Sequence, residues 1–162
     1  MRARELGKHG VVVGDRVRVV GDTSGRPDTL ARIVVIEERT TSLRRTADDT
    51  DPTERIVVAN ADQLVVVTAI TDPEPALGFL DRCLVAAYAG GLSPLLVLTK
   101  ADLASPQPLL DRYAGLEVDA VPMSQEAPLE ELVARLRDQM SVLVGQSGVG
   151  KSTLFNLSLI HI

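Results

Sequence analysis

The feature that most constrains this chain is a glycine-rich segment near its C-terminal end. Residues 145–152 read Gly-Gln-Ser-Gly-Val-Gly-Lys-Ser and fit the P-loop pattern G-x-x-x-x-G-K-[ST]. A P-loop joins a buried strand to the start of a helix. Here residues 141–144 are largely apolar, and the residues after Ser152 can begin a helix. The segment therefore predicts a strand, a phosphate-binding loop and a helix, in that order.

The chemistry of such a loop assigns a role to each residue type. Glycines at 145, 148 and 150 let backbone N–H groups approach phosphate oxygens, and the following helix presents its positive end. Lys151 would reach the β- and γ-phosphates, and the Ser152 hydroxyl would ligate Mg²⁺ through the nucleotide. A purely structural glycine-rich turn is the alternative. The predicted phosphate-binding residues are Gly145, Gln146, Ser147, Gly148, Val149, Gly150, Lys151, Ser152 and Thr153.

A second motif, Thr99-Lys100-Ala101-Asp102, precedes the P-loop and resembles the N-K-x-D motif of GTPases. The Asp102 carboxylate could accept both the N1–H and the exocyclic amine of guanine, which adenine cannot offer as a pair. The Lys100 stem would pack along the base. Thr99 stands where Asn is commoner. Ser124 matches the place of a backbone contact to the guanine oxygen, although a turn or helix-capping serine is an equal alternative.

The order of these motifs is reversed relative to ordinary small GTPases, in which the P-loop comes first. The surrounding pattern is that of an α/β sheet, because buried strands alternate with amphipathic helices. Strands are predicted at 64–69, 94–98, 118–121 and 141–144, and helices at 75–89, 107–113 and 129–139. The motif order and this pattern predict a circularly permuted P-loop GTPase domain with a mostly parallel sheet.

The first part of the chain has a different pattern. Short apolar stretches at 11–13, 16–20 and 31–38, separated by Gly- and Asp-rich turns, predict closely spaced strands and a small barrel. Residues 46–54 are acidic, contain a proline and lack periodicity, which predicts a flexible connection. The predicted organisation is an all-β barrel at 1–47, a linker at 48–55, and the α/β nucleotide-binding domain at 56–162.

Composition limits the remaining possibilities. The 162 residues have a net charge of −5, but residues 1–45 carry ten Lys and Arg against six Asp and Glu, whereas residues 46–162 carry seven against sixteen. This asymmetry indicates a basic module facing nucleic acid joined to an acidic module, or ordinary surface variation. The single cysteine, Cys83, excludes an internal disulfide and fits a cytoplasmic protein. Neither a secretory signal nor an apolar run long enough to cross a bilayer is recognisable.

Together these residues resemble the RsgA-type circularly permuted GTPases, which depend on the small ribosomal subunit. The resemblance covers about residues 10–156. It is carried by Gly14-Asp15-Arg16-Val17, by the stretch at 56–63, by Leu80-Asp81-Arg82-Cys83-Leu84, and by the two nucleotide motifs. It implies an OB-fold, a permuted GTPase domain and a C-terminal zinc-binding domain.

The resemblance also implies a function. It describes a hydrolase acting on GTP, with GTP, GDP and Mg²⁺ as ligands, that serves late maturation of the 30S ribosomal subunit in the cytoplasm and contacts 16S rRNA. We expect a monomer that does not associate with membranes. Arginines 16, 18, 32, 44 and 45 could supply rRNA contacts, or form a solvated barrel surface. Residues 1–45 contain no Phe, Tyr or Trp, so these contacts would be electrostatic and salt-sensitive.

The family's switch region, its D-x-P-G motif and its zinc domain are not recognisable in the sequence, and residues 157–162 do not resemble the family's continuation of the P-loop helix. We therefore expect a C-terminally truncated chain, with Zn²⁺ only in the missing domain and no zinc ligands here. No catalytic residue is assigned, since water positioning belongs to the missing segments. Two alternatives stay open: an ATP-using P-loop protein, and a hydrolysis-incompetent fragment acting only as an RNA- or 30S-binding module.

Overall fold

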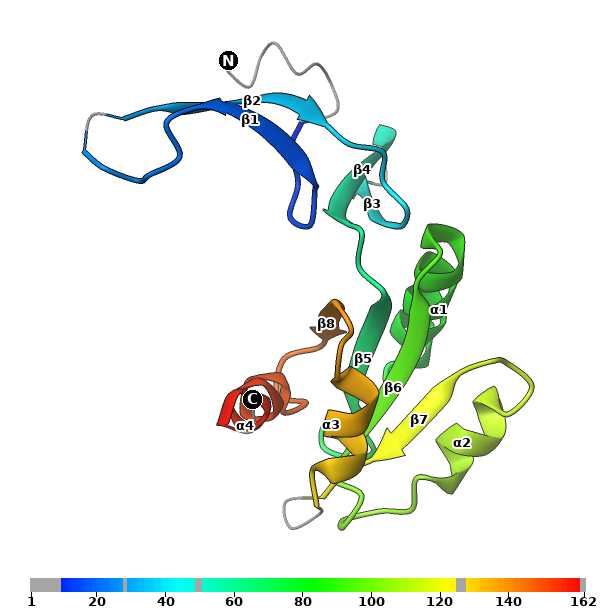
Figure 1. Ribbon diagram of the computed structural model, residues 1–162. Helices are drawn as coiled ribbons and strands as arrows, with labels where there is room; N and C mark the ends of the chain where they lie inside the picture. Colours follow the sequence, from blue (N-terminus) through cyan, green and yellow to red (C-terminus); the bar gives the residue numbers. More distant parts are fainter. Residues whose placement is uncertain (1–9, 28, 49–50, 125–127, 161–162) are drawn as a thin grey trace. The chain divides into compact units, whose positions relative to one another are not determined.

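A four-stranded parallel sheet is the framework of the second of two units, Met1–Asn60 and Ala61–Ile162, into which the chain divides. The computed structural model describes residues 10–27, 29–48, 51–124 and 128–160. The strand order is β7-β6-β5-β8, and each neighbouring pair is parallel (Figure 1). The predicted alternation of strands and helices is confirmed. The strands are β5 (Gln63–Ala69), β6 (Ser93–Thr99), β7 (Asp119–Pro122) and β8 (Ser141–Gly145).

Four helices accompany this sheet, three of them close to the predicted bounds. Helix α1 is capped by Gly91, which has a left-handed φ of 75° and whose N–H donates to the carbonyls of Ala87 and Tyr88. The helix after the P-loop runs to Ile160, so residues 157–160 continue it; residues 161–162 lie outside the described part. The helices are α1 (Leu77–Gly90), α2 (Gln107–Tyr113), α3 (Glu130–Leu136) and α4 (Lys151–Ile160).

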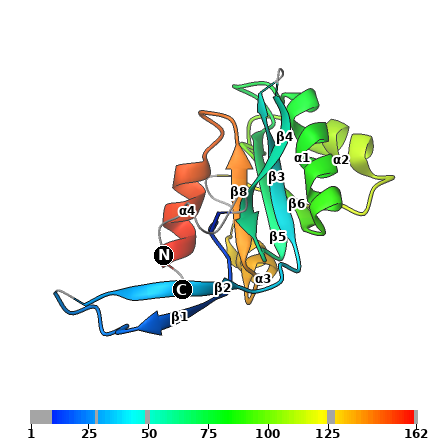
Figure 2. The same cartoon turned by 90° about the horizontal axis from the view of Figure 1, so that it is seen from above.

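The sheet is buried because helices cover both of its faces. Every residue of β5 is buried, as the continuous apolar run predicts for a central parallel strand. On one face, Leu132 of α3 and Leu154 of α4 join a core with Val65, Val67 and further residues of β6 and β7. Helices α1 and α2 lie on the other side of the sheet from α4 (Figure 2), and α1 buries Leu80, Leu84 and Ala87.

Polar side chains join helices α1 and α2. The Tyr113 hydroxyl donates to Asp81 at 2.8 Å, and Arg112 donates to the same carboxylate at 3.1 Å. The hydrogen bond from Tyr113, with help from Arg112, lowers the pKa of Asp81, whereas burial raises the pKa of Tyr113. Burial also raises the pKa of the Cys83 thiol, which agrees with a packing role inside α1.

The unit Met1–Asn60 is built from two antiparallel strand pairs. Strand β1 (Val17–Gly21) pairs with β2 (Ala31–Ile36), and β3 (Ser42–Asp48) pairs with β4 (Asp51–Ala59). An isolated bridge between Val13 and Val58 connects the segment before β1 to β4. Among the described residues these ladders do not close into one sheet, so the OB-fold barrel stays a prediction.

The expected linker is the main correction to the sequence analysis. Residues 46–48 belong to β3 and residues 51–55 to β4, while residues 49 and 50 lie outside the described part. Cross-strand pairing explains the difference: Thr46 lies opposite Glu54, and Arg44 pairs with the Glu54 carboxylate at 3.3 Å. Acidic composition and a proline disfavour a strand locally, but they do not report the partner that stabilises it.

A buried ion pair holds the predicted turn at Gly14 and Asp15. The Asp15 side chain is fully buried and accepts two hydrogen bonds from Arg39, at 2.6 and 2.8 Å. The Arg39 guanidinium, with the Val12 N–H, holds the pKa of Asp15 below its ordinary value against the effect of burial. Gly14 has a φ of 88°, and a Cβ there would lie 1.9 Å from the Ala59 carbonyl oxygen, so the turn requires glycine.

Candidate nucleotide-binding site

The residues predicted to bind nucleotide all follow carboxyl ends of parallel strands. Thr99 is the last residue of β6, Gly145 is the last residue of β8, and Ser124 follows β7 by two residues. The chain fills the sheet outward from β5 through β6 to β7 and then returns to β8 on the other side of β5. Ligands of open α/β sheets bind at such a switch point, outside the carboxyl ends of the strands. The topology therefore brings the two motifs to one edge.

The P-loop leaves the sheet at Gly145, where the backbone lies so close to β5 that there is no room for a side chain. A Cβ on Gly145 would lie 2.4 Å from the Val67 carbonyl oxygen of β5. Gly148 and Gly150 have φ values of 80° and 89°, which L residues rarely adopt. Between them Val149 is only 1% exposed and anchors the loop in the core.

The polar groups of the loop are accessible where Val149 is not. Gln146, Ser147 and Gly148 are exposed, and so are Ser152 and Thr153 in the first turn of α4. Helix α4 begins at Lys151, whose ammonium donates to the Gln146 carbonyl. An exposed loop with left-handed glycines at a helix N-terminus fits a bound phosphate. The Ser152 hydroxyl is accessible to a Mg²⁺ ion carried by the nucleotide.

Thr99 connects the two motifs directly. Its hydroxyl donates to the Val149 carbonyl oxygen at 2.8 Å and lies 3.3 Å from the Thr68 carbonyl oxygen of β5. A hydroxyl has one proton, so the shorter contact, to the P-loop, is the stronger one. The commoner Asn would supply a side-chain amide at this position, which Thr99 lacks. In this chain the hydroxyl still joins the base-reading segment to the P-loop.

The rest of the base-reading segment is held by its backbone. Lys100 has a φ of 60°, and the Ala101 N–H donates to the Met123 carbonyl at 3.0 Å, while the Met123 N–H donates to Leu98 at 2.7 Å. These bonds tie the end of β6 to the end of β7. Asp102 is exposed, with its carboxylate accessible to a ligand.

Ser124 is half-buried and adjoins Met123 at the end of β7. The N-cap of α3 is Leu129, so Ser124 does not cap that helix. Its neighbour Gln125 lies outside the described residues. The capping alternative is thereby removed for α3, and a contact from Ser124 to a base stays a prediction.

A third segment at this edge was not singled out from the sequence. The loop between β5 and α1 contains Asp72, whose carbonyl accepts a hydrogen bond from the Lys100 ammonium. The next residue, Pro73, lies beside the P-loop, since a Cβ on Gly148 would be 3.9 Å from its ring. The signal available in the sequence was positional: a loop that follows a central parallel strand lies at the ligand-binding edge.

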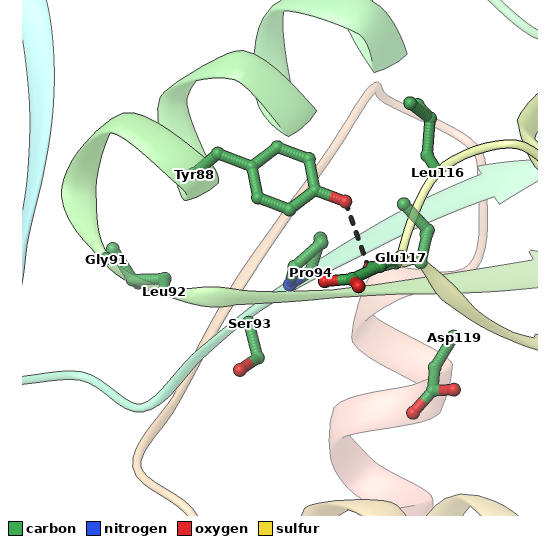
Figure 3. A pocket seen from close by; sticks show the side chains of 9 residues that line it. Tyr88, Gly91, Leu92, Ser93, Pro94, Leu116, Glu117 and Asp119 are labelled. Atoms are coloured by element: carbon green, nitrogen blue, oxygen red, sulfur yellow. Dashed lines mark hydrogen bonds between the residues drawn. The ribbon is translucent and has the colours of Figure 1, made fainter.

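A hollow among the described residues lies elsewhere. It has a volume of about 630 Å³ and is lined by residues of the α1–β6 and α2–β7 connections (Figure 3). Tyr88 spans it and donates to the Glu117 carbonyl at 3.0 Å. These residues precede or begin β6 and β7, so the hollow is at the amino-terminal edge of the sheet, opposite the two motifs.

Two features are absent from the part of the chain that the structure describes. No cluster of three or more His, Cys, Asp or Glu side chains is placed to hold a metal ion. No helix is both long and apolar enough to span a membrane.

Known proteins similar to this chain agree with the geometry. The sequence model described as RsgA GTPase matches residues 36–161. The small ribosomal subunit biogenesis GTPase RsgA of Gemmatimonas aurantiaca is 41% identical over 151 residues, covering 90% of this chain and 48% of that protein. The protein of the same name from Chromohalobacter salexigens is 40% identical over 156 residues, covering 91% of this chain and 43% of that protein.

Solved structures give the same picture. YjeQ from Thermotoga maritima superposes with a TM-score of 0.70 at 29% identity, covering 96% of this chain and 54% of YjeQ. YloQ, described as a circularly permuted GTPase, superposes with a TM-score of 0.65 at 29% identity, covering 93% and 50%. The chain thus spans about half the length of the relatives it matches. With the permuted order of its motifs and its parallel sheet, the chain belongs to the RsgA GTPase family.

Proposed function

We propose that this chain binds guanine nucleotide with Mg²⁺ at the carboxyl edge of its parallel sheet. The observation that carries the proposal is the 2.8 Å hydrogen bond from Thr99 to the Val149 carbonyl, which joins the base-reading segment to the P-loop. Asp102 would select guanine, and the Lys100 stem would pack along the base. The phosphates would lie on the P-loop and Lys151, and the Ser152 hydroxyl would face the Mg²⁺ ion.

We further propose that the whole protein is a GTP-hydrolysing factor in late maturation of the 30S subunit, acting in the cytoplasm as a monomer. The names of the relatives, small ribosomal subunit biogenesis GTPases, support this role. The bound Mg²⁺ would neutralise charge developing on the phosphates. The residues of this chain would bind and orient GTP, and we assign none of them to water activation.

The unit Met1–Asn60 would bind 16S rRNA, as an OB-fold does, through basic side chains. All five candidate arginines are exposed, which supports the proposal. Arg18 lies 3.7 Å from the Glu37 carboxylate, and Arg44 pairs with Glu54, so these two are partly neutralised. Arg16, Arg32 and Arg45 are therefore the stronger candidates for phosphate contacts.

The test is a titration of fluorescent GDP into the chain with Mg²⁺, with unlabelled GDP, GTP and ATP as competitors. Competition by guanine nucleotides alone is the expected result. Competition by ATP would indicate an ATP-using P-loop protein. If the chain folds by circular dichroism, binds no nucleotide and binds 30S particles regardless of nucleotide, it acts only as an RNA-binding module.

Asp102→Asn provides a sharper test of base selection. The amide can donate where the carboxylate only accepts, so the variant should lose GDP affinity and gain affinity for xanthosine diphosphate. Asp111→Asn, an exposed aspartate on α2, is the matched control and should leave both affinities unchanged. An unchanged preference for GDP in Asp102→Asn would refute the role given to Asp102.

A further inference from the structure

The Lys100 side chain is oriented by a loop outside both nucleotide motifs. Its ammonium donates to the Asp72 carbonyl and lies 3.8 Å from an oxygen of the Asp72 carboxylate. The Lys100 side chain is only 31% exposed, so most of its stem is covered. The hydrogen bond to the carbonyl and the charge of the nearby carboxylate therefore hold the end of a side chain whose stem is already restricted.

We propose that Asp72 is a positioning residue for Lys100, so that the β5–α1 loop forms a third wall of the guanine-nucleotide site. The inference rests on the proposed nucleotide function. A free lysine side chain loses rotamer entropy when its ammonium is fixed in one place. Holding its ammonium on Asp72 before the nucleotide arrives leaves the stem in place against the base, which improves affinity by preorganisation.

The charge of Asp72 makes the inference unexpected and testable. Its carboxylate is 94% exposed and lies near a site for an anionic ligand. If Asp72 acted only through space on the phosphates, its removal would tighten nucleotide binding. If it positions Lys100, its removal weakens binding. The two interpretations therefore predict opposite changes in nucleotide affinity when Asp72 is replaced.

The neighbouring contacts place the β5–α1 loop against both nucleotide motifs. Pro73 lies beside Gly148, and the Thr99 methyl group lies near Gly150, since added Cβ atoms there would be 3.9 and 3.8 Å away. The loop, the base-reading segment and the P-loop therefore pack together. Asp72 acts on the member of this group that contacts the base.

The experiment measures the dissociation constant of fluorescent GDP for Asp72→Asn. Asn tolerates the left-handed φ of 43° at this position, so the variant should fold, which circular dichroism checks. We expect Asp72→Asn to weaken GDP binding roughly two- to fivefold, because it removes one partner of an exposed ion pair. Glu74→Gln removes an equal charge from an exposed residue of the same loop and should change affinity by less than about twofold.

Two readouts separate positioning from a general structural effect. In a Lys100→Met background, Asp72→Asn should cause no further loss, because the group it positions is gone. Pyrophosphate with Mg²⁺, used as a competitor, occupies only the phosphate side. Its affinity should be the same in Asp72→Asn and the wild type, and this readout does not depend on the lysine variant.

Tighter or unchanged GDP binding in Asp72→Asn overturns the inference. An equal loss with Glu74→Gln, an equal loss in the Lys100→Met background, or a matching loss of pyrophosphate affinity overturns it as well. A wild-type chain that binds no guanine nucleotide overturns both this inference and the proposed function. A wild-type chain that binds GDP, with any of the other contrary results, overturns the inference alone.

Discussion

Replacing Thr99 by Val removes one hydroxyl from the contact between the base-reading segment and the P-loop. Valine has the shape of threonine, so packing is kept while the 2.8 Å bond to the Val149 carbonyl is lost. One hydrogen bond contributes about 0.5–1.5 kcal/mol net, and a buried acceptor that loses its donor costs about 1–3 kcal/mol. Val149 is 1% exposed, so water has little access to compensate. We expect the free energy of unfolding to fall by about 1–3 kcal/mol.

The same change should weaken nucleotide binding. The hydroxyl fixes the P-loop backbone relative to the segment that reads the base, so its loss allows the two to separate. A tenfold change in affinity corresponds to about 1.4 kcal/mol. We expect the dissociation constant for GDP to rise by roughly three- to tenfold, since part of the lost energy is regained when the nucleotide bridges the two segments.

The measurement is urea unfolding followed by circular dichroism at 222 nm, combined with the GDP titration. The chain has no tryptophan, so helix content is the practical signal, and all described helices belong to Ala61–Ile162. Thr99→Ser is the matched control, because it keeps the hydroxyl and removes only a methyl group. It should bind GDP within about twofold of the wild type.

The reasoning would be refuted if Thr99→Val were as stable as the wild type and bound GDP equally well. It would also be refuted if Thr99→Ser lost as much affinity as Thr99→Val. That result would assign the effect to the methyl group and its packing near Gly150.

Two further predictions concern backbone room and ion pairing. Gly145→Ala should destabilise the second unit by about 1–3 kcal/mol in urea unfolding, because its Cβ would meet the Val67 carbonyl at 2.4 Å; Gly115→Ala, with open space around it, is the control, and equal effects would contradict the argument. Arg39→Met should cost about 1–3 kcal/mol near neutral pH, because it leaves the Asp15 carboxylate without its charged hydrogen-bond partner. The pKa of Asp15 is lowered in the folded wild type, so the pair stabilises above the unfolded pKa of about 3.9 and the stabilisation is lost as pH falls through the lower folded pKa. The deficit of Arg39→Met should therefore shrink below about pH 4, and a deficit independent of pH would exclude the ion pair as its cause.

The sequence predicted the second unit well because its signals are strong and local. Apolar runs mark buried parallel strands, Gly91 ends α1, and the P-loop pattern requires a strand before it and a helix after it. The prediction of a flexible connection failed at residues 46–48 and 51–54, where each strand depends on an antiparallel partner. There the local composition argued for a loop, and only the pairing of Arg44 and Thr46 with Glu54 shows why a strand forms.

The sequence proposes the residues of the candidate site but not the contacts between them. The motifs identify Thr99, Lys100 and Asp102, yet no pattern shows that the Thr99 hydroxyl reaches Val149 or that Lys100 reaches Asp72. Both contacts join strand-end loops that are distant in the chain. Their partners are backbone carbonyls, which every residue has, so side-chain identity gives no signal for them.

The reversed motif order leaves the site intact because the sheet, and not the chain, brings its parts together. Strands β6 and β8 both pair in parallel with β5, one on each side. Their carboxyl ends therefore lie at the same edge of the sheet, whichever strand comes first in the chain. The contacts of the Thr99 hydroxyl illustrate this arrangement. It lies 3.3 Å from the Thr68 carbonyl oxygen on β5 and donates to the Val149 carbonyl oxygen of the P-loop. Motif order therefore reports connectivity, while strand order determines which groups meet at the candidate site. Gly145→Ala, which would place a Cβ 2.4 Å from the Val67 carbonyl oxygen of β5, should then impair nucleotide binding as well as stability.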